Sequence, residues 1–245
     1  TSRTRAIAPV HLYGNACEID EIVAIAGEKK LKIIWDAAQA HMTKYRGRDV
    51  GCFGDATCYS FYPTKNMTTG EGGMITTNSP GLYEKFKLLR SHGQEKKYHH
   101  TMLGLHYRMT EVEAAIGIEQ LKKLDGFVKK RRSNAKHLSS ELSRVDGITI
   151  PSSKDYVKHS YHQYSIVLDG KIDRGRLLNS LREKGIGTGI HYPKPVHKQP
   201  IFDSVVSLPV CEDISRRILS LPVHPGLTPN NINYIVSSIK ESIKV

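Results

Sequence analysis

The sequence predicts an α/β fold, because a strand, a helix and a strand follow one another near its start and the pattern changes after Pro151. Residues 6–11 form a short apolar run, and a turn at 13–15 leads to a helix of about ten residues capped near Asp20. Residues 32–35 then predict a buried strand. This order is typical of a parallel βαβ unit, whose ligand sites collect beyond the carboxyl ends of the strands.

The next part of the chain predicts one more strand and one helix. The strand covers residues 57–62 and stops at Pro63. The helix begins at Pro80, with Ser79 as its N-cap, and runs to about residue 92, where Gly93 ends it. A Gly-rich segment separates the two elements.

A long helix follows and suggests where the chain divides. Thr110 and Glu113 form a capping box, and apolar residues keep helical spacing from Val112 to Leu142. Helices of this length often bridge domains. We therefore expect a large domain over residues 1–132 and a smaller α+β domain over residues 133–245, with strands at 161–168 and 189–192 and helices near 173–184, 212–219 and 230–243.

The basic charge does not indicate a nucleic-acid partner. The 245 residues include 36 Lys and Arg and 24 Asp and Glu, which gives a formal net charge of +12. The dense basic runs 96–97 and 129–132 lie in or beside predicted helices and contain no aromatic residue for base stacking. We assign the charge to solvated surface or to an anionic small molecule, and expect no nucleic-acid partner.

The composition also argues against a membrane, disulfide or metal protein. Every apolar stretch is far shorter than the ~20 residues that span a bilayer. The 4 cysteines form no Cys-x-x-Cys pair, and the 12 histidines show no metal-ligand spacing. The chain begins with neither Met nor an apolar signal segment. We expect no metal, no membrane association and a reducing, cytoplasmic location.

Three features that could carry chemistry lie close together in the sequence. Asp36 ends a buried strand, Lys65 follows the next strand, and the Gly-rich segment 70–73 comes soon after. A lysine among apolar groups has a lowered pKa and becomes a usable nucleophile, and a carboxylate can keep a pyridine nitrogen protonated. From the residues alone, Asp36 could equally be an N-cap, Lys65 an exposed loop residue, and the glycines a turn.

A series of motifs resembles the DegT/DnrJ/StrS sugar aminotransferases in the order of that family. They begin with Trp35-Asp36-Ala37-Ala38-Gln39-Ala40-His41 and Ser60-Phe61-Tyr62-Pro63-Thr64-Lys65-Asn66, and they cover nearly the whole chain. The others are Gly51–Asp55, Thr69–Met74, Arg90–Gly93, Tyr107–Glu111, Ala114–Gly117, Gly185–Pro193 and Leu221–Leu227. The resemblance implies a three-layer, fold-type I large domain and an enzyme that uses pyridoxal 5'-phosphate. Such an enzyme moves an amino group, usually from glutamate, onto a keto sugar nucleotide in amino-sugar or polysaccharide biosynthesis.

The resemblance also implies roles for individual residues. Lys65 is the expected catalytic Schiff-base lysine and proton carrier, and Asp36 the partner of the pyridine nitrogen. Gln39 is expected beside the cofactor ring and Ser60 at the cofactor phosphate. Two more residues, His191 and Tyr192, are expected near the sugar nucleotide. Some relatives are dehydratases with His in place of the lysine, so Lys65 favours transamination.

Two features differ from the family pattern. The family usually has Asn where this chain has His106, and that residue reaches the cofactor phosphate of the neighbouring subunit. Family chains also carry an N-terminal segment with early strands, a helix N-terminus that binds the phosphate and an aromatic residue that stacks on the ring. None of it precedes Thr1. The large domain is therefore expected to be incomplete at its N-terminus and to retain the cofactor less well.

Other functions remain open on the sequence alone. The chain could be a non-catalytic fragment or remnant of such an enzyme, or an aminotransferase that acts on a keto cyclitol without a nucleotide. Uncovered apolar sheet surface usually drives association. We therefore expect a homodimer or a higher homo-oligomer.

Overall fold

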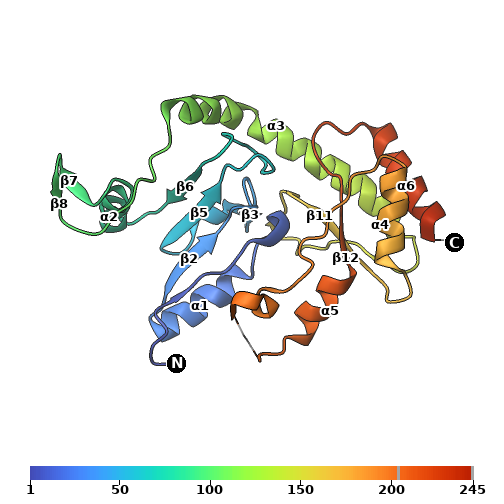
Figure 1. The fold of residues 1–245 in the computed structure, drawn as a ribbon, viewed down its shortest axis with the longest axis horizontal. Helices are drawn as coiled ribbons and strands as arrows, with labels where there is room; N and C mark the ends of the chain where they lie inside the picture. The colour runs from blue at the N-terminus through green and yellow to red at the C-terminus, as the bar shows by residue number, and fades with distance from the viewer. Residues whose placement is uncertain (203–204, 244–245) are drawn as a thin grey trace. The chain divides into compact units, whose positions relative to one another are not determined.

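The computed structural model describes residues 1–202 and 205–243, and these form two compact units (Figure 1). Unit 1 comprises residues 1–128 and 154–160, and unit 2 comprises residues 129–153 and the described residues from 161 onward. The units are close to the two predicted domains, except that residues 154–160 belong with unit 1. That each unit folds as a separate domain stays a prediction.

Unit 1 contains a four-stranded sheet in the order β1-β2-β5-β6. Its strands are β1 (Ala6–Ile7), β2 (Lys32–Asp36), β5 (Ala56–Ser60) and β6 (Gly73–Thr76). The first three run parallel, and β6 is antiparallel to β5. The predicted parallel βαβ unit is confirmed, although β1 is shorter than the apolar run 6–11 and β6 was expected only as a Gly-rich segment.

Helix α1 (Ile19–Lys29) packs against β2. Ile19 and Trp35 are both fully buried in this core. The cap predicted near Asp20 lies two residues earlier: Glu18 is the N-cap, and Asp20 lies in the first turn of the helix. An acidic residue is favourable there because its charge opposes the positive end of the helix dipole.

Helix α2 (Pro80–Arg90) begins as the sequence predicts, since the Ser79 hydroxyl accepts a hydrogen bond from Leu82 N at 3.4 Å. It ends two residues earlier than expected. Several short strands and 3₁₀ helices of unit 1 were not predicted, because elements of two or three residues leave no periodic signal. They are β3 (Lys44–Tyr45), β4 (Arg48–Asp49), β7 (Gln94–Lys96), β8 (His99–His100), β10 (Val157–Lys158) and the 3₁₀ helices η1 (Leu12–Gly14) and η2 (Val50–Cys52).

Helix α3 (Glu111–Leu142) confirms the long predicted helix and its capping box. The Glu113 carboxylate accepts from Thr110 N at 2.8 Å, and Glu113 N donates to the Thr110 hydroxyl at 3.2 Å. The helix contributes Leu124 and Val128 to a core in unit 1. In Figure 1 the strands β2 and β5 lie between α1 and the first half of α3, which gives unit 1 a layered α/β arrangement.

Unit 2 has its own sheet and core. The antiparallel sheet has the order β12-β11-β9, with β9 (Ile148–Thr149), β11 (Tyr164–Leu168) and β12 (Ile218–Leu221). Around it lie α4 (Arg174–Glu183), α5 (Pro209–Arg217), α6 (Pro229–Ile243) and the 3₁₀ helices η3 (Val196–Lys198) and η4 (Pro200–Phe202). The second half of α3 packs into this core through Ala135, Leu138 and Leu142.

Two predictions for unit 2 are wrong. Residues 189–192 form no strand: Gly189 makes one isolated bridge to Ser220, and the ring of His191 folds back over Gly189 instead of alternating along a strand. The helix predicted to run to residue 219 ends at Arg217, and Ile218–Leu221 is β12. All four β12 residues are buried, which a sheet strand accommodates on its two faces and one helix stripe does not.

Two leucines of α3 test which part of the helix stabilises the fold. Leu138 is fully buried, whereas Leu121 is 62% exposed on the same helix. We expect Leu138→Ala to lower the free energy of unfolding by about 2–5 kcal/mol through lost burial and a cavity, and Leu121→Ala to change it by less than about 0.5 kcal/mol. Urea unfolding followed by circular dichroism measures both. Equal losses in the two variants would contradict this packing.

Candidate active site

Parallel pairing brings Asp36 and Ser60 to one face of the sheet in unit 1. Asp36 pairs with Cys58 across β2 and β5, and Ser60 lies two residues beyond Cys58. Side chains two apart on a strand share a face, so Asp36, Cys58 and Ser60 point to the same side, opposite the Trp35 side that packs on α1. Ile34 lies on this face too and is 42% exposed.

The loop that carries Lys65 is closed at its base by Phe61. The Phe61 carbonyl accepts a hydrogen bond from Thr69 N at 3.0 Å, and Phe61 N donates to the Gly72 carbonyl at 2.8 Å. Within the loop, Lys65 N donates to the Tyr62 carbonyl at 3.0 Å. The lysine therefore sits in a defined turn just beyond the end of β5.

Burial and a nearby carboxylate act on Lys65 in opposite directions. Its side chain is half-buried, and burial lowers the pKa of its amine while the charge of Asp36 raises it. Asp36 is therefore close enough for its charge to act on the Lys65 amine. The Asp36 carboxylate is held by a hydrogen bond from Ala38 N at 2.9 Å, and residues 37–43 form turns rather than a helix, so Asp36 is not a helix N-cap.

His41 belongs to the same site, although the sequence assigned it no role. It is 4% exposed, and its ring centroid lies 5.4 Å from that of Tyr59 and 5.9 Å from that of Phe61. Burial lowers the pKa of His41 to about 4, and the charge of Lys65 adds to this. His41 is therefore a neutral ring near neutral pH. Its place in the Trp35–His41 motif was the only signal of its importance.

Two buried amides lie beside these groups. The Gln39 side-chain oxygen accepts a hydrogen bond from Tyr13 N at 2.6 Å and so fixes the turn at η1. Asn66, directly after Lys65, is 3% exposed, and neither of its amide atoms has a hydrogen-bond partner among the described residues. Buried polar groups nearly always have a partner, so Asn66 marks this loop as a place where a polar group is accommodated.

The other predicted site residues lie elsewhere in the chain. His106 is exposed, with its Nε2 atom 3.0 Å from Arg108 Nη2 and its ring centroid 5.2 Å from that of His92. His191 and Tyr192 belong to unit 2, with ring centroids 5.6 Å apart. The structure thus brings together Asp36, Ser60 and Lys65, whereas the roles of His106, His191 and Tyr192 stay predictions.

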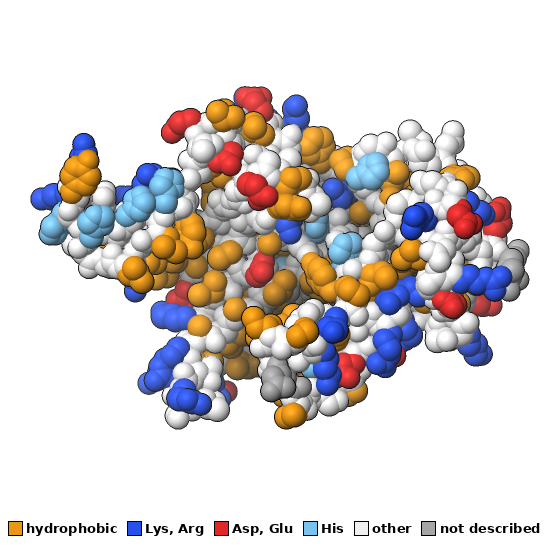
Figure 2. Space-filling view, viewed as in Figure 1, with side chains coloured by type: hydrophobic (Ala, Val, Ile, Leu, Met, Phe, Trp, Pro, Cys, Tyr) orange, Lys and Arg blue, Asp and Glu red, His pale blue; other side chains and the backbone are white. Residues whose placement is uncertain are grey.

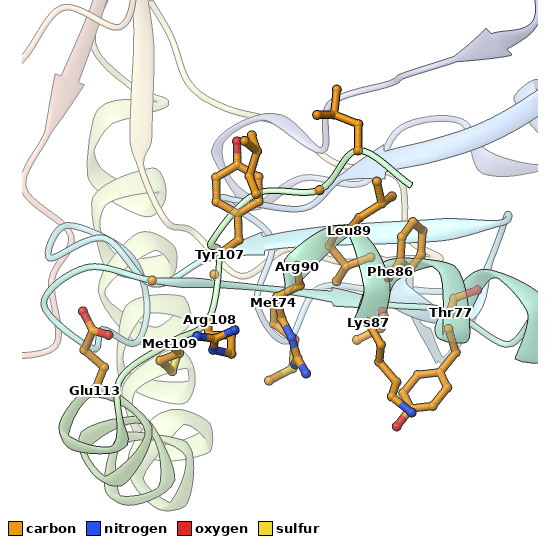
Figure 3. A pocket seen from close by; sticks show the side chains of 18 residues that line it. Met74, Thr77, Phe86, Lys87, Leu89, Arg90, Tyr107, Arg108, Met109 and Glu113 are labelled. Atoms are coloured by element: carbon orange, nitrogen blue, oxygen red, sulfur yellow. The ribbon is translucent and has the colours of Figure 1, made fainter. Parts of the chain in front are cut away.

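An apolar groove of about 1090 Å³ lies beside the site loop in unit 1. It begins at Gly72 and Gly73 and continues between β6, α2 and residues 103–109 (Figure 3). Among its exposed lining residues, Met74 is 52%, Ile75 50% and Leu103 89% exposed. Figure 3 shows Phe86 and Lys87 of α2 at one end and Met109 and Glu113 at the other.

The described residues contain no group of three or more His, Cys, Asp or Glu side chains arranged to hold a metal ion. No helix among them is both long and apolar enough to cross a membrane.

Comparison with known proteins decides the family. The family model described as the DegT/DnrJ/EryC1/StrS aminotransferase family matches residues 1–240. The chain belongs to this family. The predicted resemblance is therefore confirmed, and so is the predicted cofactor of the family, pyridoxal phosphate.

Similar proteins include several sugar-modifying enzymes. A GDP-perosamine synthase of Escherichia coli O157:H7 is 37% identical over 98% of this chain and 66% of its own length. A dTDP-3-amino-3,4,6-trideoxy-alpha-D-glucose transaminase of Streptomyces venezuelae is 35% identical over 98% of this chain and 64% of its own. The chain thus spans about two thirds of the length of these relatives.

Solved structures confirm the fold-type I architecture. DesV of S. venezuelae superposes with a TM-score of 0.95 at 34% identity, over all of this chain and 67% of its own. PseC of Helicobacter pylori, an aminotransferase of pseudoaminic acid biosynthesis, superposes with a TM-score of 0.94 at 29% identity, over all of this chain and 68% of its own. The predicted α/β fold class is correct.

The residues of unit 1 fit the family cofactor. Lys65 has an amine of lowered pKa, which suits a bond to an aldehyde. Asp36 has a fixed carboxylate, which can accept a hydrogen bond from a protonated pyridine nitrogen. Ser60, at the end of the adjoining strand, has a hydroxyl that can donate to a phosphate. The unsatisfied amide of Asn66 lies in the same loop. Lys65, Asp36 and Ser60 are thus the residues of this unit suited to hold pyridoxal phosphate.

The buried histidines predict a loss of stability in weak acid. His11 and His41 each have a pKa of about 4 when folded, against an ordinary 6.5. Between these values the unfolded chain binds protons that the folded chain does not, so stability falls as the pH falls from about 6.5 to about 4. Each histidine contributes about 2 kcal/mol to the difference between pH 7 and pH 5.

We expect His41→Gln to reduce that difference by about 2 kcal/mol, because the contribution of His41 is gone and that of His11 stays. Urea unfolding of each protein at the two pH values measures the difference. His224→Gln, at an exposed position, is the control and should behave as the wild type. The same pH difference in His41→Gln and wild type would show that His41 titrates normally.

Proposed function

We propose that this chain carries the active-site lysine of a pyridoxal-phosphate-dependent aminotransferase that acts on a keto sugar nucleotide. The amino donor is an amino acid, glutamate being the expected one, and the reaction belongs to amino-sugar or polysaccharide biosynthesis. The observation that carries the proposal is the placement of Lys65 in the turn just beyond β5, where the charge of Asp36 at the carboxyl end of β2 acts on it. The activities of related sugar-nucleotide enzymes support the substrate class.

Pyridoxal phosphate, when bound, supplies an electron sink for the carbon that loses or gains the amino group. Lys65 would hold the cofactor through Nζ, and burial favours the neutral amine that this role requires. With the cofactor and the amino donor bound, the free Nζ of Lys65 would hold and move the proton at the reacting carbon. A positioned acid or base typically contributes about 10²–10⁴-fold in rate.

The neighbouring residues bind and orient the cofactor. The Asp36 carboxylate, fixed by Ala38 N, keeps the pyridine nitrogen protonated. The Ser60 hydroxyl binds the phosphate, and Gln39 lies beside the ring, where it also fixes the Tyr13 turn. His41 is a buried neutral ring that excludes water from the surroundings of Lys65.

His191 and Tyr192 bind the sugar nucleotide in this proposal, and the net charge of +12 favours its phosphates. We propose a homodimer or higher homo-oligomer in which His106 donates to the cofactor phosphate of the neighbouring subunit. Exposed apolar side chains over β6 and α2 support association (Figure 2). The free thiols support a reducing, cytoplasmic location; they are Cys17, Cys52, Cys58 and Cys211.

Replacing the lysine tests the proposal. We expect wild type to develop a visible absorption band with pyridoxal phosphate that bleaches when glutamate is added, and Lys65→Ala to show neither change because it lacks the amine. Lys85→Ala, an exposed lysine on α2, is the matched control and should behave as wild type.

A band and bleaching in Lys65→Ala would refute the lysine assignment. If the wild type showed neither the band nor the bleaching, the result would favour the alternative that this chain is a non-catalytic fragment or remnant. Bleaching with glutamate, followed by recovery with a keto cyclitol but with no keto sugar nucleotide, would replace the proposed substrate class.

A further inference from the structure

The segment before His191 is held against β12 in unit 2. Gly189 N donates to the Ser220 carbonyl at 3.1 Å, and Ser220 N donates to the Gly189 carbonyl at 2.7 Å. A Cβ atom on Gly189 would lie 2.5 Å from Cε1 of the His191 ring. Only glycine lets the ring lie this close to the backbone, so the position of the imidazole is set by the strand beside it.

Two buried serines connect this ring to the sheet. Ser165 of β11 and Ser220 of β12 are directly opposite in the antiparallel register and are 8% and 6% exposed. Their Oγ atoms are 2.8 Å apart, and Ser220 Oγ lies 3.0 Å from His191 Nδ1. The three side chains form a continuous chain of hydrogen bonds from the core of the sheet to the imidazole.

The available hydrogen atoms decide which group donates in each of these hydrogen bonds. Within the described residues, the Ser165 hydroxyl bonds to Ser220 alone, so its hydrogen has a partner only if Ser165 donates to Ser220. The Ser220 hydrogen is then available for His191 Nδ1, which must accept it through its lone pair. In the opposite direction, the Ser165 hydrogen would be buried without an acceptor, which costs about 1–3 kcal/mol.

We infer that Ser165 and Ser220 are positioning residues that hold His191 as the tautomer with its hydrogen on Nε2, a donor for an oxygen of the substrate. The second half of this inference, the substrate contact, rests on the proposed function. Burial lowers the pKa of His191, which keeps the ring neutral and the tautomer defined near neutral pH. A neutral N–H suits a sugar hydroxyl, carbonyl or phosphate oxygen without placing a full charge beside it.

The tautomer is measured by ¹H–¹⁵N correlation spectra of the 245-residue chain labelled with ¹⁵N-histidine. We expect wild type to show one tautomer at His191, with Nε2 protonated and Nδ1 bare. Ser220→Ala should give a mixture of both tautomers, Ser165→Ala should give an intermediate loss, and Ser220→Thr, which keeps the hydroxyl, should restore the wild-type spectrum. The control is Ser180→Ala, which breaks a matched 2.8 Å pair with Ser242 in the same unit and should change nothing at His191.

A wild-type hydrogen on Nδ1, or an unchanged tautomer in both Ser220→Ala and Ser165→Ala, would overturn the inference. The spectra need neither cofactor nor turnover, so their result does not depend on the proposed function.

The substrate contact has its own readout. In an active preparation we expect Ser220→Ala to raise KM for the keto sugar nucleotide about three- to tenfold, the effect of one lost hydrogen bond, with KM for glutamate unchanged. An unchanged KM for the sugar nucleotide, in a variant whose tautomer is lost, would show that Nε2 does not bind the substrate. Failure of wild type to use any sugar nucleotide would instead refute the proposed function and leave the tautomer result in place.

Discussion

The register between β2 and β5 is the constraint on which the candidate site depends. Pairing of Asp36 with Cys58 puts Asp36 and Ser60 on one face of the sheet and at the same end of two parallel strands. A slip of one residue would turn Asp36 toward α1 and bury a carboxylate among apolar side chains. The chemistry of Lys65 therefore depends on a backbone pairing more than on any single contact at the lysine.

The core beneath the sheet stabilises that register. Trp35 is fully buried, and its ring stacks on His11 with centroids 4.8 Å apart. Gly54, at a φ of 68°, turns the chain into β5 where a Cβ would lie 2.6 Å from the indole nitrogen. The indole thus occupies the space that the glycine leaves. Packing of this one side chain links the entry of β5 to the strand that presents Asp36.

The sequence predicted those elements whose cause is local. Ser79 and the Thr110–Glu113 capping box predict where their helices begin, because a cap acts within three residues. Residues 218 and 219 were wrongly predicted as the end of a helix because their burial is set by β11, more than fifty residues away. The His191 segment was misread as a strand because neither its bonds to Ser220 nor the ring over Gly189 leaves a periodic pattern.

The sequence also predicted only part of the candidate active site. The motifs singled out Asp36, Ser60 and Lys65, and the structure brings these three together. They did not show that Gln39 holds Tyr13 or that His41 is a neutral ring, because those properties arise from burial among residues of other segments.

The most direct test of the account is to locate the bond to the cofactor. The chain is incubated with pyridoxal phosphate, reduced with borohydride so that any such bond becomes permanent, and digested for peptide mapping by mass spectrometry. We expect one predominant pyridoxylated lysine, Lys65, because its amine has a lowered pKa and lies in a defined turn beyond β5. Label spread over exposed lysines, with Lys65 unmodified, would contradict it.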